Sequence, residues 1–198
     1  MSTLDRNGNN KPYTKEDSYK NLDRVNFWIG NCDSKASFVL AFLGIFIGVF
    51  FTSDFVYDNL KNLGNTFLKF KFTDFSGFIS LIALISALIF IFKFIQAVKY
   101  TLGSLTASVD SNEYSQMGVK TDSNLHFLSI DKKGFNTHFQ EVQDLNDEKE
   151  LIHDIESQVA INSRIANRKF SNYKNGILYS KESLLYFVTF LLLSSLIR

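Results

Sequence analysis

Two long stretches of the chain contain no ionisable side chain. Residues 36–53 follow the polar cluster 31–35, and residues 75–92 lie between Asp74 and Lys93. At ~1.5 Å per residue, each stretch forms a helix of roughly 27 Å, close to the ~30 Å hydrocarbon core of a bilayer. The pattern therefore predicts two membrane-spanning helices.

A third apolar stretch, residues 183–197, is shorter and ends at Arg198. As a helix it spans only ~22 Å, unless flanking side chains reach toward the headgroups. It predicts a third crossing, with an interfacial or re-entrant helix as the alternative.

Helical periodicity continues into the polar parts of the chain. Residues 14–33 have it and run without a breaker into the first apolar stretch. A stronger pattern over 146–180 begins at Asn146, a favoured N-cap residue, and points into the third stretch. Residues 110–124 are predicted to form a loop, and 125–130 a short strand or a buried turn. The predicted fold class is an all-α membrane protein, with two to three transmembrane helices continuous with a cytoplasmic helical bundle.

The predicted organisation has six consecutive parts. They are a cytoplasmic N-terminal helix (1–35), transmembrane helix 1 (36–53), an external connection (54–74), transmembrane helix 2 (75–98), a cytoplasmic sensing segment (99–182) and a probable transmembrane helix 3 (183–197). Six basic residues lie within 1–35, three in the external connection and eleven within 93–182. This distribution favours a cytoplasmic N-terminus.

Composition and charge narrow the possible partners. The 21 phenylalanines gather in the apolar stretches and their flanks, so a lipid bilayer is the expected solvent. The net charge is +1 and no dense basic run occurs, which argues against a nucleic-acid partner. The single cysteine, Cys32, excludes an intramolecular disulfide.

No enzymatic signature is visible in the sequence. The histidines, His126, His138 and His153, do not pair with cysteines or acids at zinc spacing, and no hydrolase or phosphate-loop motif occurs. We therefore expect no catalytic residues, no metal and no cofactor. The apolar stretches also lack the deep charges of a proton relay or an ordinary transporter.

Small residues within the first two spans indicate close helix contacts. Gly44 and Gly48 are four residues apart in the first span, and Ala83 and Ala87 repeat that spacing in the second. Packing between these two helices of one chain is one interpretation. The alternative is a self-association face, and we expect a homo-oligomer.

Two groups of polar residues are candidates for ligand binding or coupling. Gln158, Asn162 and Lys169 project within a narrow arc of the long helix, beside its apolar face. They are suited to a phosphate and the edge of a base, although a solvated flank with interhelical hydrogen bonds is the alternative. Asp33 and Lys35 either cap and anchor the first span or join this site.

Several of these residues resemble motifs of the Pycsar effector transmembrane family (PycTM) of bacterial antiphage defence. The family pattern Trp-Ile-x-Asn-x-Asp-x-Lys-Ala-Ser is similar to residues 28–37, and an aromatic-containing apolar segment is similar to 125–130. A helix of the form Asp-x-x-x-Gln-x-x-x-x-Ser-x-Ile-Ala-x-x-Lys-Phe/Tyr is matched by Asp154, Gln158, Ser163, Ile165, Ala166, Lys169 and Phe170.

The resemblance implies a membrane effector gated by a cyclic nucleotide. In such a system a partner cyclase responds to phage by making a cyclic pyrimidine mononucleotide, cyclic UMP or cyclic CMP. Binding of this ligand impairs the inner membrane and stops growth before the phage matures, which is abortive infection.

Two other classes of function are compatible with the spans. A constitutive holin-like pore would need no cytoplasmic segment and no ligand. A structural membrane anchor of a partner complex would leave the membrane intact under any ligand.

Overall fold

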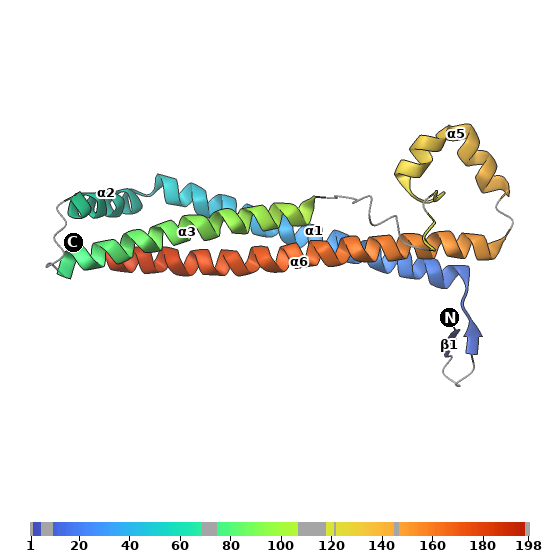
Figure 1. The fold of residues 1–198 in the computed structure, drawn as a ribbon, viewed down its shortest axis with the longest axis horizontal. Coiled ribbons are helices and arrows are strands. Elements are labelled where there is room, and N and C mark those ends of the chain that lie inside the picture. Colours follow the sequence, from blue (N-terminus) through green and yellow to red (C-terminus); the bar gives the residue numbers. More distant parts are fainter. Residues whose placement is uncertain are drawn as a thin grey trace. The chain divides into compact units, whose positions relative to one another are not determined.

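The computed structural model describes residues 2–4, 10–68, 75–106, 118–120, 122–144 and 147–196 (Figure 1). The elements are β1 (Ser2–Leu4), β2 (Asn10–Pro12), α1 (Lys15–Thr52), α2 (Asp54–Leu68), α3 (Phe75–Leu105), α5 (Phe127–Asp144) and α6 (Glu148–Ser195). The two short strands pair antiparallel, with Thr3 opposite Lys11. Almost all of the described structure is helical, which confirms the predicted all-α class apart from this hairpin.

Helix α1 begins at a capping box and then runs unbroken into the first apolar stretch. The Asp17 backbone N–H donates to Thr14 Oγ1 at 3.3 Å, and the Thr14 N–H donates to Asp17 Oδ2 at 3.1 Å. The predicted continuity is confirmed. Asp33 lies in the middle of this helix, so the predicted capping role of Asp33 is wrong.

Helix α6 joins the predicted long helix and the third apolar stretch into one helix of 48 residues. Its N-cap is Asp147, whose Oδ1 accepts the Lys149 N–H at 2.9 Å. The prediction had placed the cap at Asn146, which lies outside the described residues.

Helix α5 replaces the strand or turn predicted at residues 125–130. The helix starts at Phe127, directly after the described irregular segment 122–126. At Gly134 the backbone φ of 72° lies in the left-handed region, which glycine adopts without steric cost and which divides the helix by a kink. Most of the predicted loop 110–124 lies outside the described residues.

The chain divides into two compact units, and helices α1 and α6 each contribute to both. The polar unit contains Met1–Cys32 and Ala107–Arg168, and the membrane unit contains Asp33–Thr106 and Lys169–Arg198. Helices α1, α3 and α6 are each long and apolar enough to cross a membrane, in agreement with three predicted crossings.

Aromatic rings fill the centre of the membrane unit. Phe46 and Phe50 of α1 meet Phe90 of α3 and Phe187 of α6, with ring centroids 5.1–6.1 Å apart. The edge-on and tilted geometries are those that the aromatic quadrupole favours. This cluster of phenylalanines holds the three helices together.

Helices α3 and α6 approach closely at Gly176. A Cβ added there would lie 3.2 Å from the Thr101 backbone nitrogen and would also meet the Thr101 hydroxyl. Because the neighbour is helix backbone, it has little freedom to move aside. The absence of a side chain at Gly176 therefore sets the separation of the two helices.

Gly176→Ala is expected to lower the stability of the membrane unit by about 1–3 kcal/mol, because it overpacks this contact. Gly64→Ala in α2 is the control, since a Cβ there meets nothing within 4 Å and alanine is the better helix former. Thermal unfolding of the detergent-solubilised protein, followed by circular dichroism, should show a lower midpoint for the first variant alone. Equal midpoints would contradict the packing assignment.

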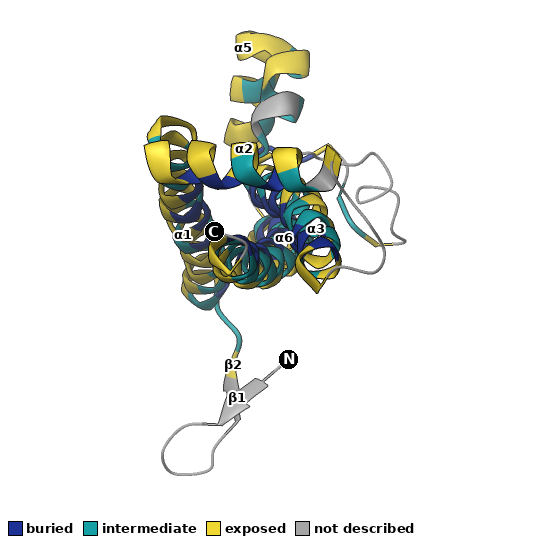
Figure 2. Ribbon diagram, turned by 90° about the vertical axis from the view of Figure 1, so that its left-hand side faces the viewer, coloured by how far each residue is buried: buried dark blue, intermediate teal, exposed yellow. Residues whose placement is uncertain are grey.

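Helix α2 occupies the predicted external connection. Its buried residues Val56, Asn59 and Leu63 recur at spacings of three and four, which is one face of an amphipathic helix. Leu63 packs with Ala83 of α3 and Phe190 of α6. Exposed residues cover the outer faces of α1 and α2 (Figure 2).

The small residues of the first two spans differ in their surroundings. Ala83 is fully buried, and Ala87 packs beside it against α2 and α6. Gly44 and Gly48 are exposed, and an added Cβ would meet nothing within 4 Å. Within the described chain these two glycines therefore do not form the contact between the first two spans that one interpretation predicted.

The apolar stretches of the membrane unit are not all aligned. The end of the α3 stretch and the beginning of the α6 stretch lie at one level, because Lys93 Nζ, just beyond the former, pairs with Glu182 Oε2, just before the latter, at 2.8 Å. Asp33, however, pairs with Lys169. The α1 stretch starts three residues after Asp33 and the α6 stretch fourteen after Lys169. The α1 stretch is thus displaced by about eleven residues, or ~16 Å, along the helix axes.

Candidate functional site

An ion pair joins the beginning of the α1 apolar stretch to α6 within the membrane unit. Lys169 Nζ lies 2.6 Å from Asp33 Oδ1 and 3.5 Å from the carbonyl oxygen of Leu105, near the end of α3. The lysine side chain is 4% exposed and the aspartate side chain 38%. The ammonium therefore connects three helices and depends on one carboxylate for charge compensation.

Lys35 does not join this contact. Two residues further along a helix, its side chain is rotated by ~200° from that of Asp33. It is exposed and makes no ion pair or hydrogen bond with any residue that the structure describes. Of the predicted polar group, the membrane unit brings together Asp33 and Lys169.

In the polar unit, side-chain hydrogen bonds tie α6 to α1 and to the residue before it. Asn162 Nδ2 donates to Asn26 Oδ1 of α1 at 2.9 Å, and the hydroxyl of Tyr13, two residues before α1, donates to the Glu156 carboxylate Oε1 at 2.6 Å. Burial, together with this bond to Glu156, raises the pKa of Tyr13 above its usual value. Asn162 therefore has the interhelical role that was one of its two predicted roles.

Asp154 and Gln158 present two buried polar atoms without a partner. The residues are 0% and 4% exposed, and neither Asp154 Oδ1 nor Gln158 Nε2 has a hydrogen-bond partner among the described residues. They lie four residues apart on α6 and therefore on one face. Each unsatisfied atom costs about 1–3 kcal/mol in the folded protein. Such a cost at neighbouring positions is typical of a binding site.

The irregular residues 118–120 and 122–126 lie along this part of α6. The Lys120 N–H donates to Ser157 Oγ at 3.0 Å, and the Asn124 N–H donates to Asp154 Oδ2 at 2.9 Å. Two backbone bonds thus hold the segment over the helix, and one of them ends on the same carboxylate.

A polar recess opens beside the first turns of α6. Its volume is about 510 Å³, within the range of small-molecule sites. The lining residues are Gly118, Val119, Lys120, Lys149, Glu150 and His153. Two lysines and the positive end of the α6 dipole favour an anion there, against one opposing carboxylate.

A sequence model of the PycTM family, described as the Pycsar effector protein domain, matches residues 17–197. The chain belongs to this Pycsar effector family. It is 33% identical over 183 residues to the Pycsar effector protein GmPycTM of Gulbenkiania mobilis, across 88% of this chain and 89% of the relative. No solved structure matches the chain.

The match to the Pycsar effector family covers all of α3, α5 and α6 and nearly all of α1. The structure places the family-motif residues Asp154 and Gln158 at an unpartnered polar pair, and the family-motif residues Asp33 and Lys169 at an ion pair. Asp154 was quoted for the resemblance but was not among the predicted site residues. Its position one helical turn before Gln158 was the available signal.

The polar unit of this Pycsar effector also contains a charge cluster around Lys133. Lys133 Nζ lies 2.6 Å from Glu141 Oε2, 3.0 Å from Asp122 Oδ1 and 2.8 Å from Asn124 Oδ1. Burial acts to lower the lysine pKa, but hydrogen bonds and charges from Glu141 and Asp122 outweigh it and raise the pKa above its usual value. Lys133 thus holds Asp122 and Asn124 in place, and the Asn124 backbone N–H in turn donates to Asp154.

Lys133→Met is expected to destabilise the polar unit by only about 1 kcal/mol, since the Asp122 and Glu141 side chains that lose their cation are 72% and 38% exposed and can turn toward water. Lys132→Met is the matched control, because the neighbouring lysine is exposed. Hydrogen exchange measured by mass spectrometry should show faster exchange over 122–144 in the first variant. Unchanged protection there would contradict a structural role for Lys133.

The histidines and acidic residues in the described part of this Pycsar effector do not form a metal site. No group of three or more His, Cys, Asp or Glu side chains among them is arranged to hold a metal ion. Burial lowers the pKa of His126 below its usual value. His126 is therefore neutral at pH 7.

Proposed function

We propose that this Pycsar effector is an antiphage protein of the bacterial inner membrane, with its N-terminus in the cytoplasm. It binds cyclic UMP or cyclic CMP made by a partner cyclase on infection. It then impairs the membrane and causes abortive infection. Family membership and the three apolar helices support the effector role and the membrane location.

The buried pair of Asp154 and Gln158 is the observation that carries the ligand-binding part of the proposal. The carboxylate oxygen is an acceptor and the amide nitrogen a donor, and neither has a partner within the described part of the chain. A pyrimidine edge offers the complementary groups. Uracil provides N3–H and a carbonyl oxygen, whereas cytosine provides its exocyclic amine and N3. Either base can therefore satisfy both atoms.

The cyclic phosphate is proposed to bind in the recess at the beginning of α6. Lys120 and Lys149 line this recess, and charge-assisted hydrogen bonds to a phosphate are among the stronger polar contacts in proteins. Asp154 is 0% exposed, and the Lys120 and Asn124 backbones are hydrogen-bonded beside it, so the base can reach Oδ1 only if these residues move aside. Binding of the ligand is thus linked to a movement of residues 118–120 and 122–126.

The long helices provide a route from this site to the membrane. α1 and α6 each continue without a break from the polar unit into the membrane unit. Ligand binding shifts an equilibrium only by its difference in affinity for two arrangements. The Asp33–Lys169 ion pair, which joins these same helices, is proposed to couple the arrangement of the spans to that equilibrium.

Several copies are proposed to act together in the membrane. The outer face of α1 carries the exposed glycines Gly44 and Gly48 beside Phe38 and Ile45, which are also exposed. Glycines four residues apart allow close helix approach. Assembly through this face would produce the homo-oligomer that membrane damage by such a short chain requires.

Dye release from liposomes that contain the full-length protein tests the proposed function. Cyclic UMP or cyclic CMP should trigger release, whereas cyclic AMP, the purine control, should not. Release without any ligand would instead identify a constitutive pore. No release with any of the three nucleotides would favour a structural anchor.

A further inference from the structure

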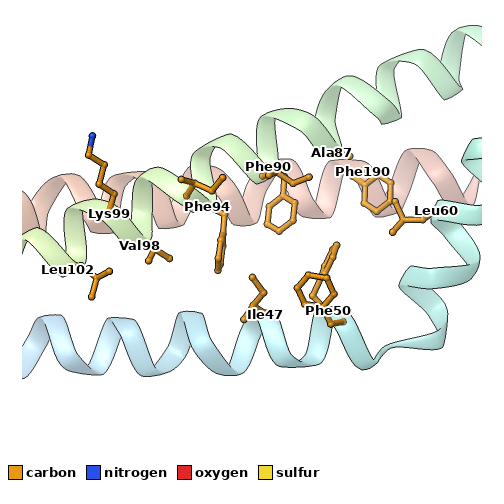
Figure 3. A pocket seen from close by; sticks show the side chains of 13 residues that line it. Ile47, Phe50, Leu60, Ala87, Phe90, Phe94, Val98, Lys99, Leu102 and Phe190 are labelled. Atoms are coloured by element: carbon orange, nitrogen blue, oxygen red, sulfur yellow. The ribbon is translucent and has the colours of Figure 1, made fainter.

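An apolar groove runs between α1 and α3 in the membrane unit. Its volume is about 820 Å³. Figure 3 shows Phe90 and Phe94 of α3 pointing toward Ile47 and Phe50 of α1 across it. Leu60 of α2 and Phe190 of α6 close the far end. Apart from Lys99, every lining side chain is a hydrocarbon or an aromatic ring.

One side of the groove is open. Its rim on α3 is formed by Ile91, Ile95 and Lys99, which follow one another at intervals of four residues and therefore lie in one row. Ile91 and Ile95 are 49% and 57% exposed. The groove is thus accessible along its length from the surroundings of the bundle.

The dimensions of the groove match a lipid chain. Its α3 lining runs from Leu102 to Ala87, which corresponds to ~22 Å along the helix and exceeds the ~15 Å of one hydrocarbon leaflet by about half. The Leu102 end lies close to the level of Asp33, because Leu105 and Asp33 both contact Lys169. The groove therefore begins where the α1 apolar stretch begins.

Lys99 places a positive charge near the Leu102 end of the groove. Lys99 is exposed and has no ion pair or hydrogen bond with any residue in the described part of the chain, unlike Lys93, which pairs with Glu182. Its stem lines the groove, and its nitrogen points away from α1 (Figure 3). This is the geometry of a lysine that reaches for a headgroup while its stem stays in hydrocarbon.

The displaced apolar stretches explain why the groove needs an occupant. A bilayer aligned with the stretches of α3 and α6 ends near Lys93, but the groove continues past it to Val98 and Leu102. Hydrocarbon reaches those residues if a lipid chain is drawn into the groove. The groove then bridges the ~16 Å displacement between α1 and the other two spans.

We propose that the groove binds one acyl chain of an anionic phospholipid, whose phosphate pairs with Lys99. The chain lies along Ile95 and Ile91 toward Ala87. The lipid holds α1 in its displaced position, and its binding does not depend on a nucleotide.

The full-length protein, extracted in mild detergent and washed, should retain phospholipid at about one molecule per chain. Ile95→Trp fills the groove and should remove this lipid. Ile85→Trp is the matched control, since Ile85 is an exposed isoleucine of α3 outside the groove. Thermal unfolding of both variants, measured in parallel, identifies a loss that comes from misfolding rather than from occlusion.

The headgroup is tested by reloading washed protein from vesicles of phosphatidylglycerol or of phosphatidylcholine. Lys99→Gln should reduce the preference for phosphatidylglycerol by about fivefold, equivalent to the ~1 kcal/mol that one lysine gains near an anionic surface. Lys174→Gln on α6, which also removes an exposed lysine, should leave it unchanged.

Equal lipid retention by folded Ile95→Trp and Ile85→Trp would overturn the proposal. Equal headgroup preference in the two lysine variants would also overturn it. So would a disulfide-linked dimer formed through Ile95→Cys in lipid-free protein, because a second copy would then fill the groove. The site would be established if Ile95→Trp removes the retained lipid and Lys99→Gln reduces the preference for phosphatidylglycerol.

Discussion

Asp33→Asn is expected to destabilise the membrane unit more than Lys169→Met does, although both remove the same ion pair. Asp33→Asn leaves the buried ammonium of Lys169 without its counter-charge, which costs about 3–5 kcal/mol for a buried pair. Lys169→Met leaves a carboxylate that is 38% exposed and can turn toward water. Its loss should be near the ~1 kcal/mol of a partly exposed contact.

Thermal unfolding in detergent and a double-mutant cycle measure this asymmetry. The combined Asp33→Asn and Lys169→Met variant should be more stable than Asp33→Asn alone, because no charge remains buried. Lys35→Met is the control, since its side chain is exposed and takes no part in the contact. If Lys169→Met proved the more damaging change, the burial assigned to the two partners would be wrong.

Alanine variants of the same two residues separate coupling from anchoring in cells. If the ion pair couples the ligand to the membrane, Asp33→Ala and Lys169→Ala should abolish nucleotide-dependent toxicity while the protein still inserts. Fractionation of membranes reports insertion, and growth with an active cyclase reports toxicity. Loss of insertion in both variants would leave anchoring as the function of the pair.

The sequence was sufficient to predict the long helices and their continuity, but not the rotation of each helix toward its neighbours. Periodicity placed Asp33 and Lys35 at one level, and only the arrangement of α1, α3 and α6 decided that Asp33 pairs with Lys169. A signal was nevertheless present. Asn26 and Asp33 are seven residues apart, as are their partners Asn162 and Lys169, and this is the repeat of two parallel helices in contact.

Helix α2 illustrates a second limit. Charged residues in 54–74 marked it as a connection outside the membrane, because a membrane-spanning stretch is expected to lack ionisable groups. The amphipathic spacing of Val56, Asn59 and Leu63 was visible all the same. What the sequence could not supply was the surface that this face covers, since that surface is formed by α3 and α6 together.

Asp154→Asn and Gln158→Leu are expected to weaken nucleotide binding without lowering stability. Asp154→Asn keeps an acceptor oxygen for the Asn124 N–H and removes a buried charge whose second oxygen has no partner. Gln158→Leu removes a buried unpaired amide, so both variants should be at least as stable as the parent. Each should lose about 10- to 100-fold in affinity for the cyclic pyrimidine nucleotide, the value of a hydrogen bond that involves a buried charge or donor.

Calorimetric titration of the same preparations measures the nucleotide affinity, and thermal unfolding measures the stability. Asp23→Asn is the control for charge, because Asp23 is an exposed carboxylate of α1 outside the α6 recess and should change neither quantity. Lower affinity together with equal or higher stability is the informative result, since sites built for a ligand are commonly less stable than their inert variants. A loss of stability with intact affinity would show that Asp154 and Gln158 are structural residues whose partners form within the protein, and the nucleotide would then bind elsewhere.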